Sequence, residues 1–133
     1  EQERRRSIYI HIKRSLQVPI LAAFDVPETE FTCPERFVST QPTQALGMLN
    51  SEFLNEQAGI LADLVAKAHP EDLRAQVALT LRRVTQRAPT NRDIDRGLAL
   101  IGDLEREHAL SRSDARRYFC LLALNLNAFV YID

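Results

Sequence analysis

The hydrophobic and polar positions of this chain repeat with two different periods. Near the N-terminus, Ile8, Ile10 and Ile12 alternate with Tyr9 and His11. A period of two in a segment rich in β-branched residues favours a strand. A helix remains the alternative, because Ile8 and Ile12 also share a helical face.

From residue 43 onward, apolar residues recur at the three- and four-residue spacing of amphipathic helices. The segments predicted to be helical are 43–50, 52–68, 70–88, 91–107 and 112 to about 127. The fold class is therefore mainly α, a helical bundle of about five helices.

Capping residues precede three of these segments. Ser51 is a candidate N-cap, and Thr90 with Asp93 resembles a capping box. Ser111 begins a similar pattern. For the segment after residue 69, Pro70 stands where a first helical residue is favoured, so we expect that helix to begin at Pro70.

The domain prediction is one helical domain over residues 1–133. It consists of an extended, irregular arm at 1–42, a helical core at 43–127 and a terminal strand at 128–133. Pairing of this strand with residues 7–13 is left open.

Composition sets the broad class of the protein. The 133 residues are 45% hydrophobic and 26% charged, with a net charge of -1. These values are ordinary for a globular domain and argue against a globally basic nucleic-acid binder. Because the chain begins at Glu1 and its single methionine is Met48, we expect a fragment or C-terminal module of a larger protein.

No self-contained catalytic or metal-binding motif is present in the sequence. His11, His69, His108, Cys33 and Cys120 have no spacing that places two ligands on one helical face. The favoured interpretation is surface histidines and two free, mostly buried thiols, with a disulfide as the alternative. No Gly-x-Ser-x-Gly elbow or phosphate-binding glycine loop occurs.

Three glycines lie inside helical patterns rather than in loops: Gly47, Gly59 and Gly97. A glycine in that position removes the side chain that would separate two helices. We therefore expect close helix approach at these positions rather than a ligand site.

The least generic stretch is the acidic, proline-containing connector over residues 25–42 and the helix start after it. Its candidate ligand or interface residues are Asp25, Arg36, Ser39, Thr40 and Gln44. Hydroxyls and an arginine at a helix start can hold an anion. The competing interpretation, which we favour, is that the hydroxyls cap the helix while Arg36 pairs with Asp25 or a nearby glutamate.

Two amides near the end of the chain, Asn125 and Asn127, are further candidates. A buried amide needs hydrogen-bond partners, so these two residues are interpreted as structural clamps on the connector. A weaker alternative function is nucleic-acid binding through basic clusters at residues 4–6, 13–14, 82–83 and 112–117.

Several short motifs occur together in a fixed order and carry a family resemblance. They are Arg5-Arg6-Ser7-Ile8-Tyr9, Lys13-Arg14-Ser15, Ala23-Phe24-Asp25-Val26-Pro27, Cys33, Arg36, Ser39-Thr40, Pro42-Thr43-Gln44-Ala45-Leu46, Leu49-Asn50, Phe53 and Leu124 to Tyr131. This set resembles the C-terminal part of a planctomycete-type family, the domain of unknown function 1553. Ala128 departs from the acidic residue expected there.

The resemblance implies a setting rather than a reaction. Such proteins are large, exported and periplasmic or associated with the cell envelope, and they commonly carry a planctomycete cytochrome c domain upstream. Haem c is then expected in that upstream domain, because this chain has no Cys-x-x-Cys-His motif.

The resulting function hypothesis is a non-catalytic packing and interaction module. Its partners would be the upstream domains of the same polypeptide and, further, an electron-transfer or periplasmic protein. The alternative is that Asp25, Arg36, Ser39 and Thr40 complete a hydrolase-type or ligand-binding site together with upstream residues.

Overall fold

The computed structural model describes Tyr9, His11, residues 21–22, Phe24 and residues 42–131. The chain divides into two units, residues 1–47 and 48–133. Of the segment predicted as an N-terminal strand, only Tyr9 and His11 are described, and neither is in a strand. The organisation into one domain with an arm and a core stays a prediction.

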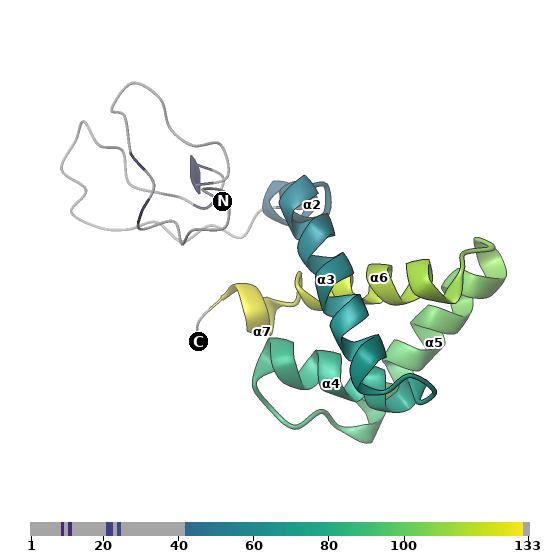
Figure 1. Cartoon of the computed structure of the whole chain (residues 1–133). Helices are drawn as coiled ribbons and strands as arrows, with labels where there is room; N and C mark the ends of the chain where they lie inside the picture. The colour runs from purple at the N-terminus through teal and green to yellow at the C-terminus, as the bar shows by residue number, and fades with distance from the viewer. Residues whose placement is uncertain (1–8, 10, 12–20, 23, 25–41, 132–133) are drawn as a thin grey trace. The chain divides into compact units, whose positions relative to one another are not determined.

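The described residues are mainly helical and contain no strand. The helices are α2 (Pro42–Leu49), α3 (Glu52–Ala68), α4 (Leu73–Thr85), α5 (Asn91–Glu107), α6 (Arg112–Ala123) and α7 (Asn127–Val130) (Figure 1). The prediction of a mainly α bundle is confirmed. None of the helices in this part of the chain has the length and hydropathy needed to cross a bilayer.

Side-chain caps begin three of the long helices at the residues that the sequence indicates. The Ser51 hydroxyl accepts a hydrogen bond from the backbone N–H of Leu54, and the Ser111 hydroxyl accepts one from that of Asp114. Thr90 and Asp93 form a reciprocal capping box. Each cap satisfies an N–H group that the helix itself leaves unpaired.

The predicted start of α4 at Pro70 is wrong. The helix begins at Leu73, and the Asp72 carboxylate accepts a hydrogen bond of 2.9 Å from the backbone N–H of Ala75. An aspartate at the N-cap satisfies an unpaired N–H, whereas proline at the first position only removes one. The cap therefore determines where α4 begins.

The strand predicted at 128–133 is also wrong for its described residues. Residues 127–130 form the single helical turn α7, in which the backbone N–H groups of Phe129 and Val130 both donate to the carbonyl of Leu126. An isolated strand leaves its N–H and C=O groups unpaired, whereas a helical turn pairs them locally. A short apolar run fits either conformation, which is why its periodicity misled the prediction.

The core of the second unit lies between α3, α4, α5 and α6. The contact between α3 and α6 is the most extensive, and Figure 1 shows the two helices crossing. The buried hydrophobic residues of the core are Ala58, Ala62, Val65, Val77, Leu81, Val84, Ile94, Ile101, Ala115, Phe119, Cys120, Leu121, Ala123 and Leu124. Helix α6 supplies the largest share of them.

Gly97 permits the closest of these helix contacts. A Cβ atom at residue 97 would lie 2.7 Å from Cγ1 of Val77 and 2.9 Å from Cε2 of Phe119. The predicted close approach is therefore confirmed at Gly97. It is wrong at Gly47, where a Cβ would meet nothing within 4 Å, and at Gly59 the nearest atom is an ordinary 4.0 Å away.

Candidate functional site

The connector residues of the predicted anion site lie outside the described residues. These residues are Asp25, Arg36, Ser39 and Thr40. Gln44 is described: it belongs to α2 and is buried. The anion-site hypothesis and its competing capping interpretation both stay predictions.

The two candidate amides near the C-terminal end differ from each other. Asn125 is half-buried, and its Nδ2 donates a 2.7 Å hydrogen bond to the carbonyl of Leu121 one turn earlier. Asn127 is exposed and begins α7. Asn125 thus closes the end of its own helix, while the predicted clamp on the connector lies outside the described residues.

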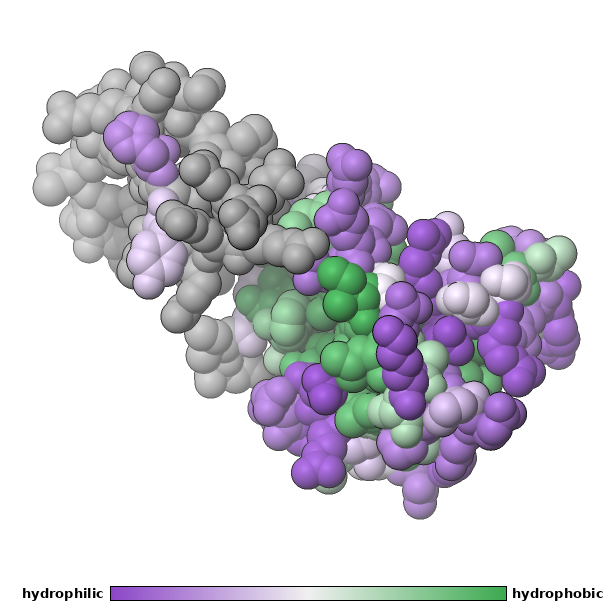
Figure 2. Space-filling model, viewed as in Figure 1, coloured by the Kyte–Doolittle hydropathy of each residue, from purple (hydrophilic) through white to green (hydrophobic). Residues whose placement is uncertain are grey.

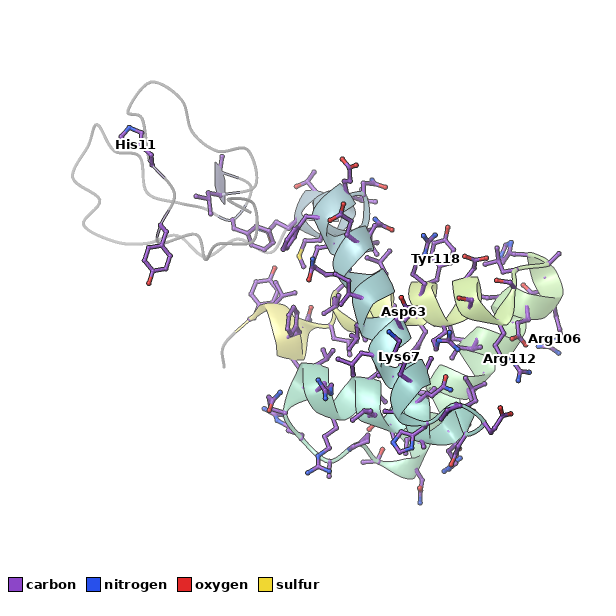
Figure 3. All side chains as sticks on the ribbon, in the orientation of Figure 1. His11, Asp63, Lys67, Arg106, Arg112 and Tyr118 are labelled. Atoms are coloured by element: carbon purple, nitrogen blue, oxygen red, sulfur yellow. The ribbon has the colours of Figure 1, made fainter. Side chains whose placement is uncertain are left out.

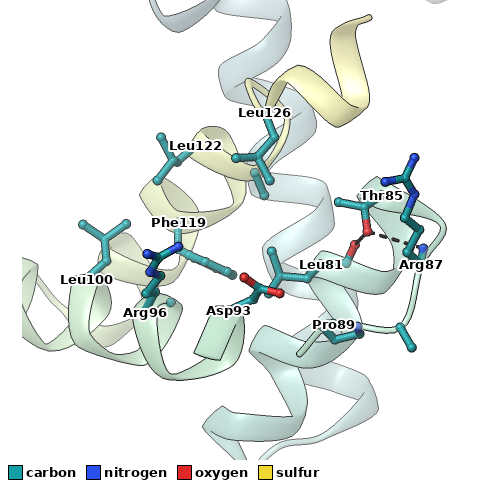
Figure 4. Close-up of a pocket in the computed structure, with 13 residues that line it drawn as sticks. Leu81, Thr85, Arg87, Pro89, Asp93, Arg96, Leu100, Phe119, Leu122 and Leu126 are labelled. Carbon is teal, nitrogen blue, oxygen red and sulfur yellow. Dashed lines mark hydrogen bonds between the residues drawn. The ribbon is translucent and has the colours of Figure 1, made fainter. Parts of the chain in front are cut away.

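An apolar groove of about 400 Å³ opens between the end of α4, the start of α5 and the end of α6 (Figure 4). Its lining residues are Leu81, Thr85, Arg87, Ala88, Pro89, Asp93, Arg96, Gly97, Leu100, Phe119, Leu122, Ala123 and Leu126. The volume lies within the range of about 300–1,000 Å³ typical of small-molecule sites. Among the described residues, this groove is the strongest candidate for a binding site.

One edge of the groove is fixed by the way α4 ends. Gln86 adopts a left-handed backbone conformation with φ of 56°, and its N–H donates to the carbonyl of Arg82. The Thr85 hydroxyl donates to the carbonyl of Leu81 and accepts a hydrogen bond from the N–H of Arg87. These contacts hold residues 85–87 as a turn, so this edge of the groove is preformed.

The opposite edge is fixed by the start of α5. The Asp93 carboxylate accepts hydrogen bonds from the hydroxyl of Thr90 at 2.6 Å and from its backbone N–H at 3.1 Å. These hydrogen bonds lower the pKa of Asp93, and the charges of Arg96 and Arg92 lower it further. Asp93 is therefore an anion at neutral pH, and one of its carboxylate oxygens, Oδ2, accepts both hydrogen bonds of the cap.

The floor of the groove is the ring of Phe119. Because residue 97 has no side chain, this ring reaches the backbone of α5 and is only 4% exposed. Leu122, one turn further along α6, is 46% exposed. The floor of the groove is thus well packed, whereas its mouth exposes apolar side chains to solvent.

The lining of the groove is mostly apolar and carries a few polar groups. Its polar lining groups within the described residues are the Thr85 hydroxyl, the Asp93 carboxylate and the guanidinium groups of Arg87 and Arg96. The hydroxyl and the carboxylate are engaged in local hydrogen bonds. Apolar walls with two cations can orient a ligand, but they provide no activated nucleophile paired with a base.

Sequence reasoning missed this groove, although one signal was available. The signal is the composition of the last long helical segment, in which apolar residues occupy most of the circumference of the helix. A helix can use one apolar face in the core and leave another at the surface. Tyr118 and Leu122 form such a face, being 41% and 46% exposed.

A row of polar side chains inside the core was also missed. Buried Gln76 of α4 donates through Nε2 to the carbonyl of His69 at 2.6 Å and accepts a 3.4 Å hydrogen bond from Arg116 of α6. One turn further along both helices, the Thr80 hydroxyl lies 3.9 Å from Sγ of Cys120. The signal was the polar pair at residues 76 and 80 beside the apolar stripe of α4.

Metal ligation finds no support among the described residues. No group of three or more histidine, cysteine or acidic side chains comes together there. The three histidines are exposed, and His69 and His108 stand at the C-terminal ends of α3 and α5.

Cys120 is a free and fully buried thiol. Burial raises its pKa to about 11, an effect that the contact with Thr80 and the charge of Arg116 partly oppose. A thiol with so high a pKa is protonated at neutral pH and is a poor nucleophile. The free, buried thiol predicted here is confirmed, whereas Cys33 lies outside the described residues.

The described arginines of the predicted basic clusters serve different local functions. Arg112 pairs with Glu105 at 3.1 Å, Arg116 reaches Gln76, and the guanidinium of Arg117 lies 5.2 Å from the centre of the Tyr118 ring. These three contacts lie within the helical unit. The nucleic-acid alternative stays a prediction.

A second apolar surface follows α3. Phe53 and Ile60 are 43% and 50% exposed, and the half-buried Gln57 and Leu64 continue the same helical face. Figure 2 shows hydrophobic side chains gathered over the middle of α3. Figure 3 labels two charged residues of this helix, Asp63 and Lys67. Both are exposed, and Lys67 follows Ile60 by two turns, so it borders the apolar surface.

Comparison with known proteins yields a family and no closer relative. No curated protein and no solved structure matches the chain. The model of the PSD1 family, described as protein of unknown function (DUF1553), matches residues 1–101. Because this match covers 101 of the 133 residues, the chain belongs to the PSD1 (DUF1553) family.

Proposed function

We propose that this chain is a non-catalytic packing and interaction module of a larger exported, cytochrome c-linked polypeptide. The exposed apolar face of α3, formed by Phe53, Ile60 and Leu64, is the surface that packs against an upstream domain of that polypeptide. The family membership is consistent with such a parent, and the residue motifs that resemble exported, haem-linked proteins support the setting.

The observation that carries this proposal is the unequal use of the two apolar faces of α3. Ala58, Ala62 and Val65 are buried against the bundle, whereas Phe53 and Ile60 are about half exposed. A helix that serves only its own bundle needs a single apolar face. Large exposed apolar side chains on a second face are typical of an interaction surface.

The energy available from this face is modest but sufficient for an intramolecular contact. Completing the burial of Phe53 and Ile60 would contribute roughly 1 kcal/mol each, half of the value for full burial. Domains joined in one polypeptide have a high effective concentration, so a contact of this strength can hold them together.

The test compares two double variants of the parent polypeptide. Phe53→Ser with Ile60→Ser removes the apolar face, and Glu52→Ser with Asp63→Ser changes two exposed acidic residues on another side of the same helix. We expect the first variant, and not the second, to make the module melt separately from the parent and to open its linker to limited proteolysis. Neither variant should alter the melting temperature of the isolated 133-residue chain by more than a few degrees.

Equal behaviour of the two variants in the parent would refute the packing role. The alternative function, a hydrolase-type or ligand-binding site completed by Asp25, Arg36, Ser39 and Thr40, is tested separately. Under that alternative, Arg36→Ala abolishes an activity of the parent without changing its melting temperature. A nucleic-acid role would instead give an affinity that falls steeply with salt.

A further inference from the structure

The groove between α4, α5 and α6 is open, apolar and unequally charged at its rim. Leu100, Leu122 and Leu126 form its open walls, and Phe119 forms its floor (Figure 4). Removing apolar surface of this kind from water lowers the free energy in proportion to the area buried. An apolar ligand would therefore gain from entering it.

The charges available at the rim are positive. Arg87 and Arg96 line the groove, and neither belongs to the three ion pairs of the described residues, which join Arg74 to Asp95, Arg106 to Asp103 and Arg112 to Glu105. The carboxylate of Asp93 also lines the groove, but it accepts two hydrogen bonds from Thr90 as part of the helix cap. The groove is therefore lined by two arginines and one carboxylate, and Oδ2 of that carboxylate already accepts the hydrogen bonds of the cap.

We propose that this groove binds a small amphipathic carboxylate, a free organic acid with an aliphatic or aromatic tail. The tail lies along Leu122 and Leu126 above the ring of Phe119, and the carboxylate pairs with the guanidinium of Arg96 beside the floor. This proposal is independent of the packing role assigned to α3, because it uses different helices and different side chains.

The size and charge of the groove favour a small free ligand over a second copy of the chain. A volume of about 400 Å³ suits a small molecule. An isologous dimer would bring the arginines of a second copy to the same rim, where like charges repel. A ligand with one carboxylate neutralises this rim instead.

The test uses three probes with the same ten-carbon chain and different head groups: decanoate, decanol and decylammonium, each below its micellar concentration. Calorimetry with the full 133-residue chain should show one site for decanoate. Decylammonium should bind at least tenfold more weakly than decanoate, and decanol should fall between them. Equal affinities for the three probes would indicate nonspecific partition and would overturn the proposal, as would absence of decanoate binding.

Two variants and a control locate the site. Leu122→Gln should weaken decanoate binding about tenfold, and the melting temperature verifies that this half-exposed position tolerates the change. Arg96→Gln should weaken it about fivefold, the scale of a partly exposed ion pair, and should abolish the preference for decanoate over decanol. Arg92→Gln changes an exposed arginine of the same helix that does not line the groove, and should have no effect.

Other outcomes would refute the proposal. If Leu122→Gln leaves decanoate affinity unchanged, the ligand binds elsewhere. If the chain instead self-associates through this face, sedimentation shows a dimer that Leu122→Gln dissociates, and the occupant is a second copy. Failure of either kind leaves the α3 experiment unaffected, so the two proposals can be judged separately.

Discussion

Helix α6 has one side that is packed against α4 and another side that is exposed at the groove; we call them the closed and the open side. Against α4, Arg116 and Cys120 meet Gln76 and Thr80, and Cys120 is completely buried. Toward the groove, Leu122 is 46% exposed, which is more than Arg116. The comparison shows that exposure on this helix is determined by what the neighbouring helices supply, and not by the hydrophobicity of the residue itself.

The family match and the structural unit have different limits. The match ends at residue 101, within α5. The core nevertheless depends on α6, because Ala115, Phe119 and Cys120 are buried in it. A fragment limited to the matched residues would expose the surfaces of α3 and α5 that α6 covers, so the folding unit is longer than the match.

The largest expected difference comes from truncating, in separate variants, two side chains that lie one turn apart on α6. Phe119→Ala should lower the free energy of unfolding by about 3–5 kcal/mol, because it empties the packed floor against Gly97. Leu122→Ala should lower it by about 1 kcal/mol or less, because this side chain is already half exposed. Denaturant unfolding of both variants measures the difference, and equal losses would show that the groove is closed in solution.

The closed side can be tested through the pH dependence of stability. An ordinary thiol ionises near 9.0, and burial raises the pKa of Cys120 to about 11. Below pH 9 the thiol is neutral in both the folded and the unfolded state. Between pH 9 and 11 only the unfolded state loses its proton, so stability falls with rising pH by up to about 3 kcal/mol in total.

The measurement is the free energy of unfolding from pH 8 to 11 for the wild type and for Cys120→Ala. The variant differs from the wild type only in lacking the thiol, so the difference between the two curves isolates Cys120. Parallel curves would mean that the thiol is solvated in the folded state. Rapid alkylation of Cys120 in the native protein at pH 8, distinguished from that of Cys33 by peptide mass spectrometry, would lead to the same conclusion.

The boundary between the closed and open regions can be tested with two glycines of α5. Gly97→Ala should cost about 1–2 kcal/mol, since its Cβ would lie 2.7 Å from Val77 and 2.9 Å from Phe119. Gly102→Ala is the matched control: a Cβ there meets nothing within 4 Å. It should stabilise the helix by about 0.5–1 kcal/mol, and thermal melting should shift in opposite directions for the two variants.

The elements of the helical unit were largely predictable from the sequence because they depend on local signals. Ser51, Thr90 and Ser111 are caps whose hydroxyls act within three residues. The start of α4 was misplaced because Pro70 and Asp72 are both favoured at the beginning of a helix. Only the hydrogen bond from the N–H of Ala75 to Asp72, seen in the structure, distinguishes them. The conformation of residues 127–130 was missed because a short apolar run has no period of its own.

The groove and the buried polar row could not be predicted in the same way. The contact between Gln76 and Arg116 joins residues 40 positions apart, and it depends on how α4 and α6 cross. The exposure of Leu122 likewise depends on where α5 lies. Periodicity indicates that a position is apolar, but it does not indicate which of two apolar faces is covered.

The smallest expected effect concerns the cap at the edge of the open region. Thr90→Ala removes the hydroxyl that accepts from the N–H of Asp93 and donates to its carboxylate, and should cost about 1 kcal/mol. Ser111→Ala removes the corresponding cap of α6, away from the groove, and should cost a similar amount. Only Thr90→Ala should also weaken decanoate binding, because it frees the Asp93 carboxylate beside the ligand.

This cap should also depend on pH in a defined direction. The hydrogen bonds from Thr90 lower the pKa of Asp93 below its ordinary value of 3.8. The carboxylate therefore contributes stability above that value, and the contribution is lost as the pH falls through the lowered pKa of the folded state. The stability difference between the wild type and Thr90→Ala should accordingly shrink between pH 5 and pH 2. A difference that stays constant over this range would show that the capping box does not form in solution, and the start of α5 would then not provide a fixed edge for the groove.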